Sequence, residues 1–206
     1  MQTASSSKSL SPIRLHAGKE AGGWPLAIPH ASAGSYIATM QSPDLFAGIH
    51  PPPERFVPEK IVSGGQTGVD RGALDAAIML GIAHGGWCPA GRLAEDGRVP
   101  SKYQLDELES RYYPDRTEQN VIDSDATLLL YRGKITGGTK LTLRICRKAN
   151  KPSLSVSVVD GDECAEEIAA WLAEIRPTVL NVAGPRESNA KGIQVETREL
   201  LLHLLG

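Results

Sequence analysis

Short apolar runs alternate with helical periods from Glu59 to the end of the chain. That alternation is typical of strands in a parallel sheet with helices packed against its faces, so we expect an α/β fold. Five segments are the predicted strands: KIVS (60–63), HGGW (84–87), ATLLLY (126–131), SLSVSV (153–158) and TVLNV (178–182).

Apolar residues at helical spacing lie between and after these strands and predict the helices. Two pairs of carboxylates, Asp115 with Glu118 and Asp160 with Glu163, have the spacing of a helix N-cap and its N3 partner. We interpret them as starts of helices, the first running over 116–124, rather than as catalytic groups. The apolar stripes are Val69, Ala73, Ala76, Ala77 and Leu80; Leu141, Ile145 and Ala149; Ala165, Ile168, Ala169 and Leu172; and Ile193, Thr197, Leu200, Leu201 and Leu204.

Residues 1–58 differ in composition from the rest of the chain. They hold eight of the 14 prolines, and five serines lie between Ser5 and Ser11. No helical or strand period is present there. We therefore interpret 1–58 as a Pro/Ser-rich N-terminal extension, partly disordered, or as a start of translation placed too far upstream. The expected domain is 59–206, in keeping with a chain length typical of one domain.

The segment from Cys88 to Pro114 is longer than the usual connection in a compact α/β domain, and it has no clear period. Long loops of this kind tend to be lids or binding loops, so we expect a site beside the strand that ends at Trp87. Cys88 has His84 nearby in sequence. Residues four apart in an extended segment are about 13 Å apart, so we expect a structural cysteine and not a Cys–His nucleophile.

Composition excludes several classes of function. The chain has 22 Lys plus Arg and 24 Asp plus Glu, a net charge of −2, so we expect no nucleic-acid partner. No apolar stretch approaches the roughly 20 residues that cross a bilayer, and no secretory signal is present, so we expect a cytoplasmic protein without a membrane partner. The three cysteines form no CxxC pair, which predicts reduced thiols and no protein metal site.

A first glycine-rich turn follows the strand 60–63 and precedes a helix. It contains Gly64, Gly65, Gln66, Thr67 and Gly68. Free backbone N–H groups and the positive end of the helix dipole attract phosphate or another oxyanion at such a place. The alternative is a tight turn without a ligand.

Two polar residues lie close after this turn, in the predicted helix. Asp70 and Arg71 could bind polar groups of the same ligand. Alternatively, Asp70 simply favours the helix dipole from the first turn.

A second turn, Thr136-Gly137-Gly138-Thr139, also connects a strand to a helix. Both turns follow carboxyl ends of strands, where ligands bind in open α/β sheets, so we expect a shared ligand. Lys140 follows Thr139, which is the wrong order for a Walker A loop, and no GxGxxG fingerprint is present. The ATPase and dehydrogenase hypotheses are therefore disfavoured.

A third turn, Ala183-Gly184-Pro185-Arg186, ends the last strand. Arg186 could hold an oxyanion through two hydrogen bonds, although an arginine on a loop is often just solvated. A weaker set of candidates is the polar cluster of Arg116, Glu118 and Asn120, in which Arg116 and Asn120 share a helix face.

Five long motifs stand in one order between residues 64 and 188: GGQTGVDRGALDAAI, GGWCPAGRLAEDG, RTEQNVIDSDATLLL, GKITGGTKLT and LNVAGPRES. Together they resemble the family of molybdenum carrier proteins, circularly permuted members of the SLOG superfamily. The resemblance covers residues 59–206 and says nothing of residues 1–58. It implies a Rossmann-like, three-layer α/β fold with a mostly parallel sheet flanked by helices, usually in a homo-oligomer.

The resemblance also implies a ligand. For carrier proteins this is the molybdenum cofactor, a pterin with a terminal phosphate and a dithiolene-bound molybdenum oxide, which the protein binds and protects. The motifs carry over these binding positions: Gly64, Gly65, Gln66, Thr67, Gly68, Thr136, Gly137, Gly138, Thr139, Ala183, Gly184, Pro185 and Arg186.

One departure bears on enzymatic activity. Related lysine-decarboxylase-like proteins, which are phosphoribohydrolases, carry PGGxGTxxE, but here Lys140 and Leu141 follow the second turn and no Glu stands at the expected place. Asp70, Glu118 and Glu187 are the carboxylates that could replace it. We therefore expect binding and assign no catalytic residue. The alternatives are hydrolysis of a nucleoside monophosphate and sensing of a nucleotide signal.

Overall fold

The computed structural model describes residues 55–206, except for the side chains of 160–162. All of the described residues belong to one compact unit. The extension predicted over 1–58 lies outside the described residues apart from its last four.

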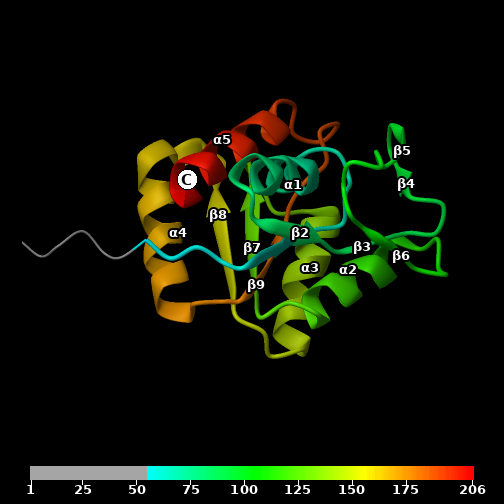
Figure 1. Cartoon of the computed structure of the whole chain (residues 1–206), viewed down its shortest axis with the longest axis horizontal. Helices are drawn as coiled ribbons and strands as arrows, with labels where there is room; N and C mark the ends of the chain where they lie inside the picture. The colour runs from blue at the N-terminus through cyan, green and yellow to red at the C-terminus, as the bar shows by residue number, and fades with distance from the viewer. Residues whose placement is uncertain (1–54) are drawn as a thin grey trace, which may run out of the picture. The chain divides into compact units, whose positions relative to one another are not determined.

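Five parallel strands form the central sheet (Figure 1). Their order across the sheet is β2-β1-β9-β7-β8, so the α/β architecture with a parallel sheet is confirmed. The strands are β1 (Lys60–Val62), β2 (Ala83–Gly85), β7 (Ala126–Tyr131), β8 (Ser153–Ser157) and β9 (Val179–Ala183).

The second predicted strand, 84–87, is wrong at its end. β2 stops at Gly85, and Gly86 has a φ of 120° that an L side chain rarely adopts. A Cβ on Gly86 would lie 2.3 Å from the carbonyl oxygen of Ser63. The chain therefore bends away from the sheet here, and the next two residues pair elsewhere.

Helices cover both faces of the sheet, as Figure 1 shows. The first face carries α1 (Val69–Leu80), α4 (Gly161–Ile175) and α5 (Ile193–Leu205), whereas α2 (Tyr113–Ile122) and α3 (Gly137–Lys148) lie on the second. The short 3-10 helix η1 (Val158–Asp160) leads into α4. No helix in residues 55–206 is long and apolar enough to span a membrane.

The predicted start of α2 is wrong by three residues. The helix begins at Tyr113, with Tyr112 as its N-cap and Pro114 in the first turn. Proline fits there because first-turn N–H groups have no partner within the helix. Asp115 is therefore not the cap; its carboxylate accepts a hydrogen bond from the Ser110 hydroxyl.

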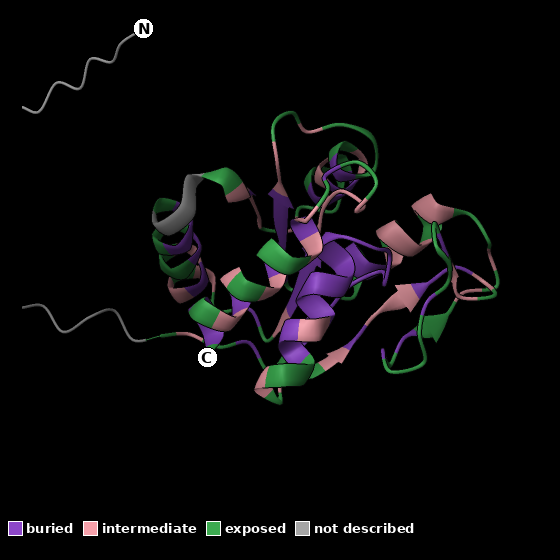
Figure 2. Ribbon diagram, turned by 90° about the horizontal axis from the view of Figure 1, so that it is seen from above, coloured by how far each residue is buried: buried purple, intermediate pink, exposed green. Residues whose placement is uncertain are grey.

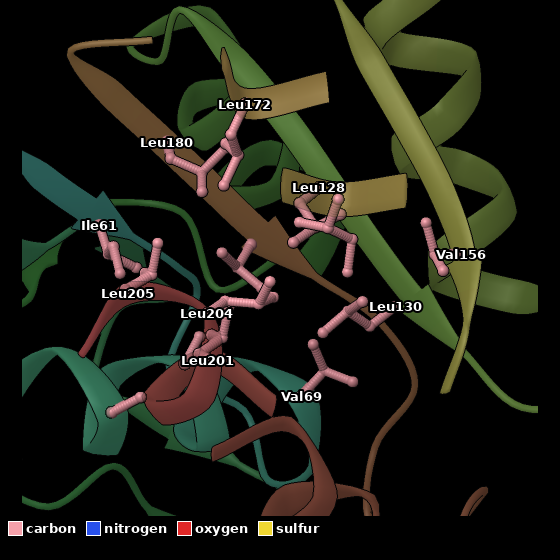
Figure 3. Packing of buried hydrophobic residues seen from close by; sticks show 14 of the residues in the cluster. Ile61, Val69, Leu128, Leu130, Val156, Leu172, Leu180, Leu201, Leu204 and Leu205 are labelled. Atoms are coloured by element: carbon pink, nitrogen blue, oxygen red, sulfur yellow. The ribbon is translucent and has the colours of Figure 1, made fainter. Parts of the chain in front are cut away.

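The main core lies between the sheet and α1, α4 and α5. Buried residues converge on this layer in Figure 2, and Figure 3 shows how the strand side chains meet those of the helices. A smaller core under α2 and α3 contains Val121, Ile145 and Cys146. The fully buried side chains of the main core include Ile61, Leu128, Leu130, Leu180, Ile168 and Leu201.

Residues 86–112, which make up most of the long loop, form an ordered lobe with a small core that it shares with Leu74 of α1. The lobe contains two two-stranded sheets: β3 (Trp87–Cys88) with β6 (Asp106–Glu107), and β4 (Leu93–Ala94) with β5 (Gly97–Arg98). Arg92 ties the lobe together through hydrogen bonds from its guanidinium to four backbone carbonyls. The lobe core consists of Leu74, Cys88, Ala94, Val99, Tyr103 and Leu105.

Candidate functional site

A cavity of about 370 Å³ lies at the carboxyl ends of β1, β9 and β7. This volume is within the roughly 300–1,000 Å³ typical of small-molecule sites. The loop after β7 leads to α3 on one face of the sheet, and the loop after β9 leads to α5 on the other. In open α/β sheets such a reversal leaves a crevice in which ligands bind.

The second glycine turn presents an open helix N-terminus to this cavity. Thr136, the N-cap of α3, has extended backbone and makes no side-chain capping hydrogen bond. The first turn of α3 contains no acidic residue. A Cβ on Gly137 or Gly138 would meet nothing within 4 Å. The N–H groups of this twelve-residue helix are therefore accessible to an anion.

The first glycine turn is different, because the protein itself uses several of its amides. The N–H of Gln66 donates to the Asp70 carboxylate (3.2 Å), and the N–H of Thr67 donates to Oε1 of Gln66 (3.1 Å). The N–H of Val69 donates to the carbonyl of Pro185 (3.2 Å). The expectation of free amides is wrong for these three groups. The Asp70 carboxylate already offsets the positive end of the α1 dipole here.

The glycines of the first turn make room for protein groups. A Cβ on Gly64 would lie 1.4 Å from NH1 of Arg116, so the arginine occupies that space. Arg116 forms an ion pair with Asp70 at 2.9 Å, and both side chains are largely buried. Gly65, with a φ of 72°, packs against Leu105 of the lobe in the same way.

Four predicted binding positions do not line the cavity. Arg71 forms two hydrogen bonds with the Asp96 carboxylate, at 2.6 and 2.7 Å. Thr67 donates to the Glu95 carboxylate, while Gly65 and Gly68 pack against backbone and side chains of neighbouring loops. The other predicted positions line the cavity: Gly64, Gln66, Asp70, Thr136, Gly137, Gly138, Thr139, Ala183, Gly184, Pro185 and Arg186.

In the third turn, the Arg186 guanidinium lies over the ring of Tyr113, 4.8 Å from its centroid. Its neighbour Ser188 donates through its N–H and its hydroxyl to Glu95. Partial desolvation alone would raise the pKa of the Glu95 carboxyl, which is largely exposed, but the hydrogen bonds from Ser188 and Thr67 hold it below its usual value. Glu95 therefore joins the lobe to the first and third turns as a carboxylate.

Positive charge dominates the cavity wall. The wall contains Arg116, Arg132, Lys134 and Arg186, with Asp70 as its one carboxylate among the described residues. Arg132 also pairs with Glu196 on α5. Because the whole chain carries a net charge of −2, the cavity is a local concentration of positive charge.

The sequence analysis missed some residues of this wall and expected part of the site in another place. The sequence analysis does not single out four residues of the wall, although the two cationic ones lie within four residues before the second turn and offered a signal: Tyr113, Tyr131, Arg132 and Lys134. Arg116 and Asn120, the weaker candidates, do line the cavity. Of the predicted long loop, Cys88 to Pro114, only Tyr113 and Pro114 line the cavity, so the part of the loop next to Trp87 does not contribute to its wall.

Neither of the other two candidate carboxylates reaches the cavity. Glu118 is exposed and lies 3.7 Å from Lys148, while Glu187 accepts hydrogen bonds from the N–H groups of Gly192 and Gln194 at the start of α5.

Burial raises the pKa of Cys88, which lies in the lobe core. Among the described residues, no group of three or more His, Cys, Asp and Glu side chains could hold a metal ion.

The fold and the cavity define a Rossmann-like α/β protein with a ligand cavity at the carboxyl ends of its strands. Comparison with family models identifies the family: residues 61–205 match the circularly permutated YpsA SLOG family. The chain belongs to this family, and the resemblance in the sequence is confirmed.

A solved structure extends the comparison. The crystal structure of the "Putative molybdenum carrier protein" from Syntrophus aciditrophicus SB has 44% sequence identity and a TM-score of 0.70. The match covers 74% of this chain and 97% of that chain. A search of curated proteins found no match.

Proposed function

We propose that this chain binds a phosphorylated, anionic small molecule in the cavity, and that the ligand is the molybdenum cofactor, which the protein carries and protects. The observation that carries the proposal is the uncapped N-terminus of α3, open over Gly137 and Gly138, on a cavity wall with four cationic side chains. The name of the Syntrophus protein supports the choice of ligand.

The chemistry of the cavity fits such a ligand. The phosphate and the molybdenum oxide are both anionic, and the N–H groups of α3 with Lys134 and Arg186 supply the matching donors and charge. Metal-binding clusters are absent from the described residues. We expect the molybdenum to arrive within the cofactor rather than at a site of protein ligands.

Binding is favoured over hydrolysis of a nucleotide. A general base must be free to take a proton in the geometry of the reaction. Asp70 is instead held by Arg116 at 2.9 Å and by the N–H of Gln66 at 3.2 Å. The same anion site would accept the 5′-phosphate of a nucleotide, so nucleotide binding, in a hydrolase or a sensor, is the second candidate.

The test is a thermal-shift panel with molybdenum cofactor, molybdate and nucleoside monophosphates, because a ligand of the native state raises the Tm. The cofactor should stabilise the protein, and Arg186→Ala should weaken that effect. Arg144→Ala, which removes an exposed charge of α3 outside the cavity, is the matched control. Stabilisation by nucleotides alone would overturn the choice of ligand, and release of free base would identify a hydrolase.

A further inference from the structure

Three buried polar atoms on residues of the cavity wall have no hydrogen-bond partner within the protein. They are Nε2 of Gln66, Nε of Arg116 and Oδ1 of Asn181. Gln66 is 3% exposed and Asn181 is 2% exposed. Native proteins rarely leave such atoms unpaired, so they indicate what a ligand must offer.

The orientation of the Gln66 amide is fixed by its oxygen. Oε1 accepts hydrogen bonds from the N–H of Thr67 (3.1 Å) and from the N–H of Glu95 (2.8 Å). Exchanging the oxygen and the nitrogen of this amide would set its NH₂ group against two other donors. Gln66 therefore keeps an unpaired donor on a residue of the cavity wall.

The Asn181 amide is held in the opposite sense. Its Nδ2 donates to the hydroxyl oxygen of Thr127 on the neighbouring strand, at 3.2 Å. The Thr127 hydroxyl oxygen is therefore the partner of the Asn181 nitrogen and not of its oxygen. Oδ1 of Asn181 is therefore left as an acceptor.

A bare oxyanion satisfies only part of this set. Molybdate presents only acceptor oxygens, which would pair with Gln66 and Arg116 and leave Oδ1 of Asn181 without a donor. A nitrogen heterocycle with a ring N–H or amino group beside a carbonyl or ring nitrogen presents both kinds of group. The pyrimidinone ring of a pterin is of this type.

We infer that Gln66 and Asn181 determine specificity in this cavity by recognising a nitrogen heterocycle that carries both a donor and an acceptor. The inference rests on the proposed function and adds a second recognition element to it. The N-terminus of α3 holds the anionic end of the ligand, and the two amides select its ring. Inorganic anions are then poor ligands.

Two variants separate recognition of the ring from binding of the anionic group. Asn181→Leu removes the acceptor at similar volume. Gln66→Glu keeps an oxygen for Thr67 and Glu95 and converts the donor into an acceptor. Gln119→Leu, an amide on α2 that does not line the cavity, is the control. Thermal unfolding of each variant establishes that it is folded.

Affinities of the full chain are measured by calorimetry for a phosphorylated pterin, ribose 5-phosphate and inorganic phosphate. The wild type should bind the pterin about tenfold or more tightly than ribose 5-phosphate, which lacks the ring. Asn181→Leu and Gln66→Glu should remove most of this preference, while Gln119→Leu should keep it. The added charge of Gln66→Glu weakens the binding of both phosphorylated ligands, so its general effect cancels in the ratio of their affinities.

The outcomes distinguish the two proposals. Equal wild-type affinity for the three ligands, or a ring preference unchanged in both folded variants, would overturn the role of the amides and leave the anion site standing. Absence of binding by all three ligands would instead count against the proposed function. If Asn181→Leu does not fold, the ring preference of Gln66→Glu decides the role of the amides, and equal wild-type affinities overturn it without any variant.

Discussion

Gly64 and Gly138 are both glycines of predicted phosphate turns, yet they have different physical roles. At Gly64 the Arg116 guanidinium occupies the space of a side chain, whereas the space over Gly138 is open. The first glycine lets two protein groups form an ion pair, and the second leaves helix amides accessible. Sequence alone cannot separate these roles, because Arg116 is 52 residues away along the chain.

This difference gives a prediction for stability. Gly64→Ala should lower the free energy of unfolding by roughly 1–3 kcal/mol, because Arg116 must move off Asp70 or clash with the new methyl group. Gly138→Ala should keep or raise it, by up to about 1 kcal/mol, because alanine favours a helix more than glycine does. Urea unfolding of both variants measures the two values, and equal effects would contradict the account.

The charge of Arg186 gives a second prediction. Replacing it with alanine should weaken binding of inorganic phosphate or a phosphorylated ligand by roughly tenfold, because a hydrogen bond from a charged donor is lost. Added salt should weaken binding by the wild type and weaken it less in the variant. Calorimetry at two salt concentrations measures this, and identical salt dependence in the two proteins would argue against a contact with Arg186.

At the level of elements, the lobe of residues 86–112 buttresses the glycine turns. Glu95 and Asp96 make its attachments, to Thr67 and Ser188 and to Arg71 respectively. These contacts explain why Thr67 and Arg71, which sequence reasoning assigned to the ligand, point elsewhere. A lobe without hydrophobic periodicity gave no signal of where its carboxylates would lie.

The attachment predicts a dependence on pH. A hydrogen bond from Arg71 lowers the pKa of Asp96, and hydrogen bonds from Ser188 and Thr67, opposed by burial, lower the pKa of Glu95. Both carboxylates therefore stabilise the fold above their ordinary pKa values of 3.8 and 4.5, and this stabilisation is lost as the pH falls through the lowered values.

Combining Glu95→Gln with Asp96→Asn should flatten the acid limb of the stability curve and speed hydrogen exchange across the lobe. Because both carboxylates are exposed, the change in global stability should be small. Unfolding as a function of pH, together with exchange measured by mass spectrometry, tests this. Unchanged exchange in residues 86–112 would show that the attachments do not hold the lobe.

The regular elements were the predictable part of the fold. Apolar periods located α1, α3, α4, α5 and four of the five strands to within a few residues, because burial in the two cores determines both. Errors occurred at Gly86, where the chain approaches Ser63, and at Tyr112, which caps α2 without a recognisable capping side chain. Both depend on contacts or backbone geometry that no local pattern records.

Over the whole molecule, topology creates the site. The strand order β2-β1-β9-β7-β8 brings three turns, separated by up to 120 residues in sequence, to one edge of the sheet. Most predicted site residues meet there because carboxyl ends of parallel strands share an edge. The four cationic side chains of the wall, Arg116, Arg132, Lys134 and Arg186, then distinguish this cavity from the rest of a chain of net charge −2. Homo-oligomerisation and a cytoplasmic location stay predictions.

The central claim is that the N-terminus of α3 holds the anionic end of the molybdenum cofactor. Calorimetric titration of the wild type and of Gly138→Leu with the cofactor tests it most directly. We predict saturable binding by the wild type and its loss in the variant, with an unchanged Tm in the absence of ligand, because the added side chain enters open space. Equal affinity in the two proteins would contradict this placement, and absence of binding by the wild type would contradict the choice of ligand.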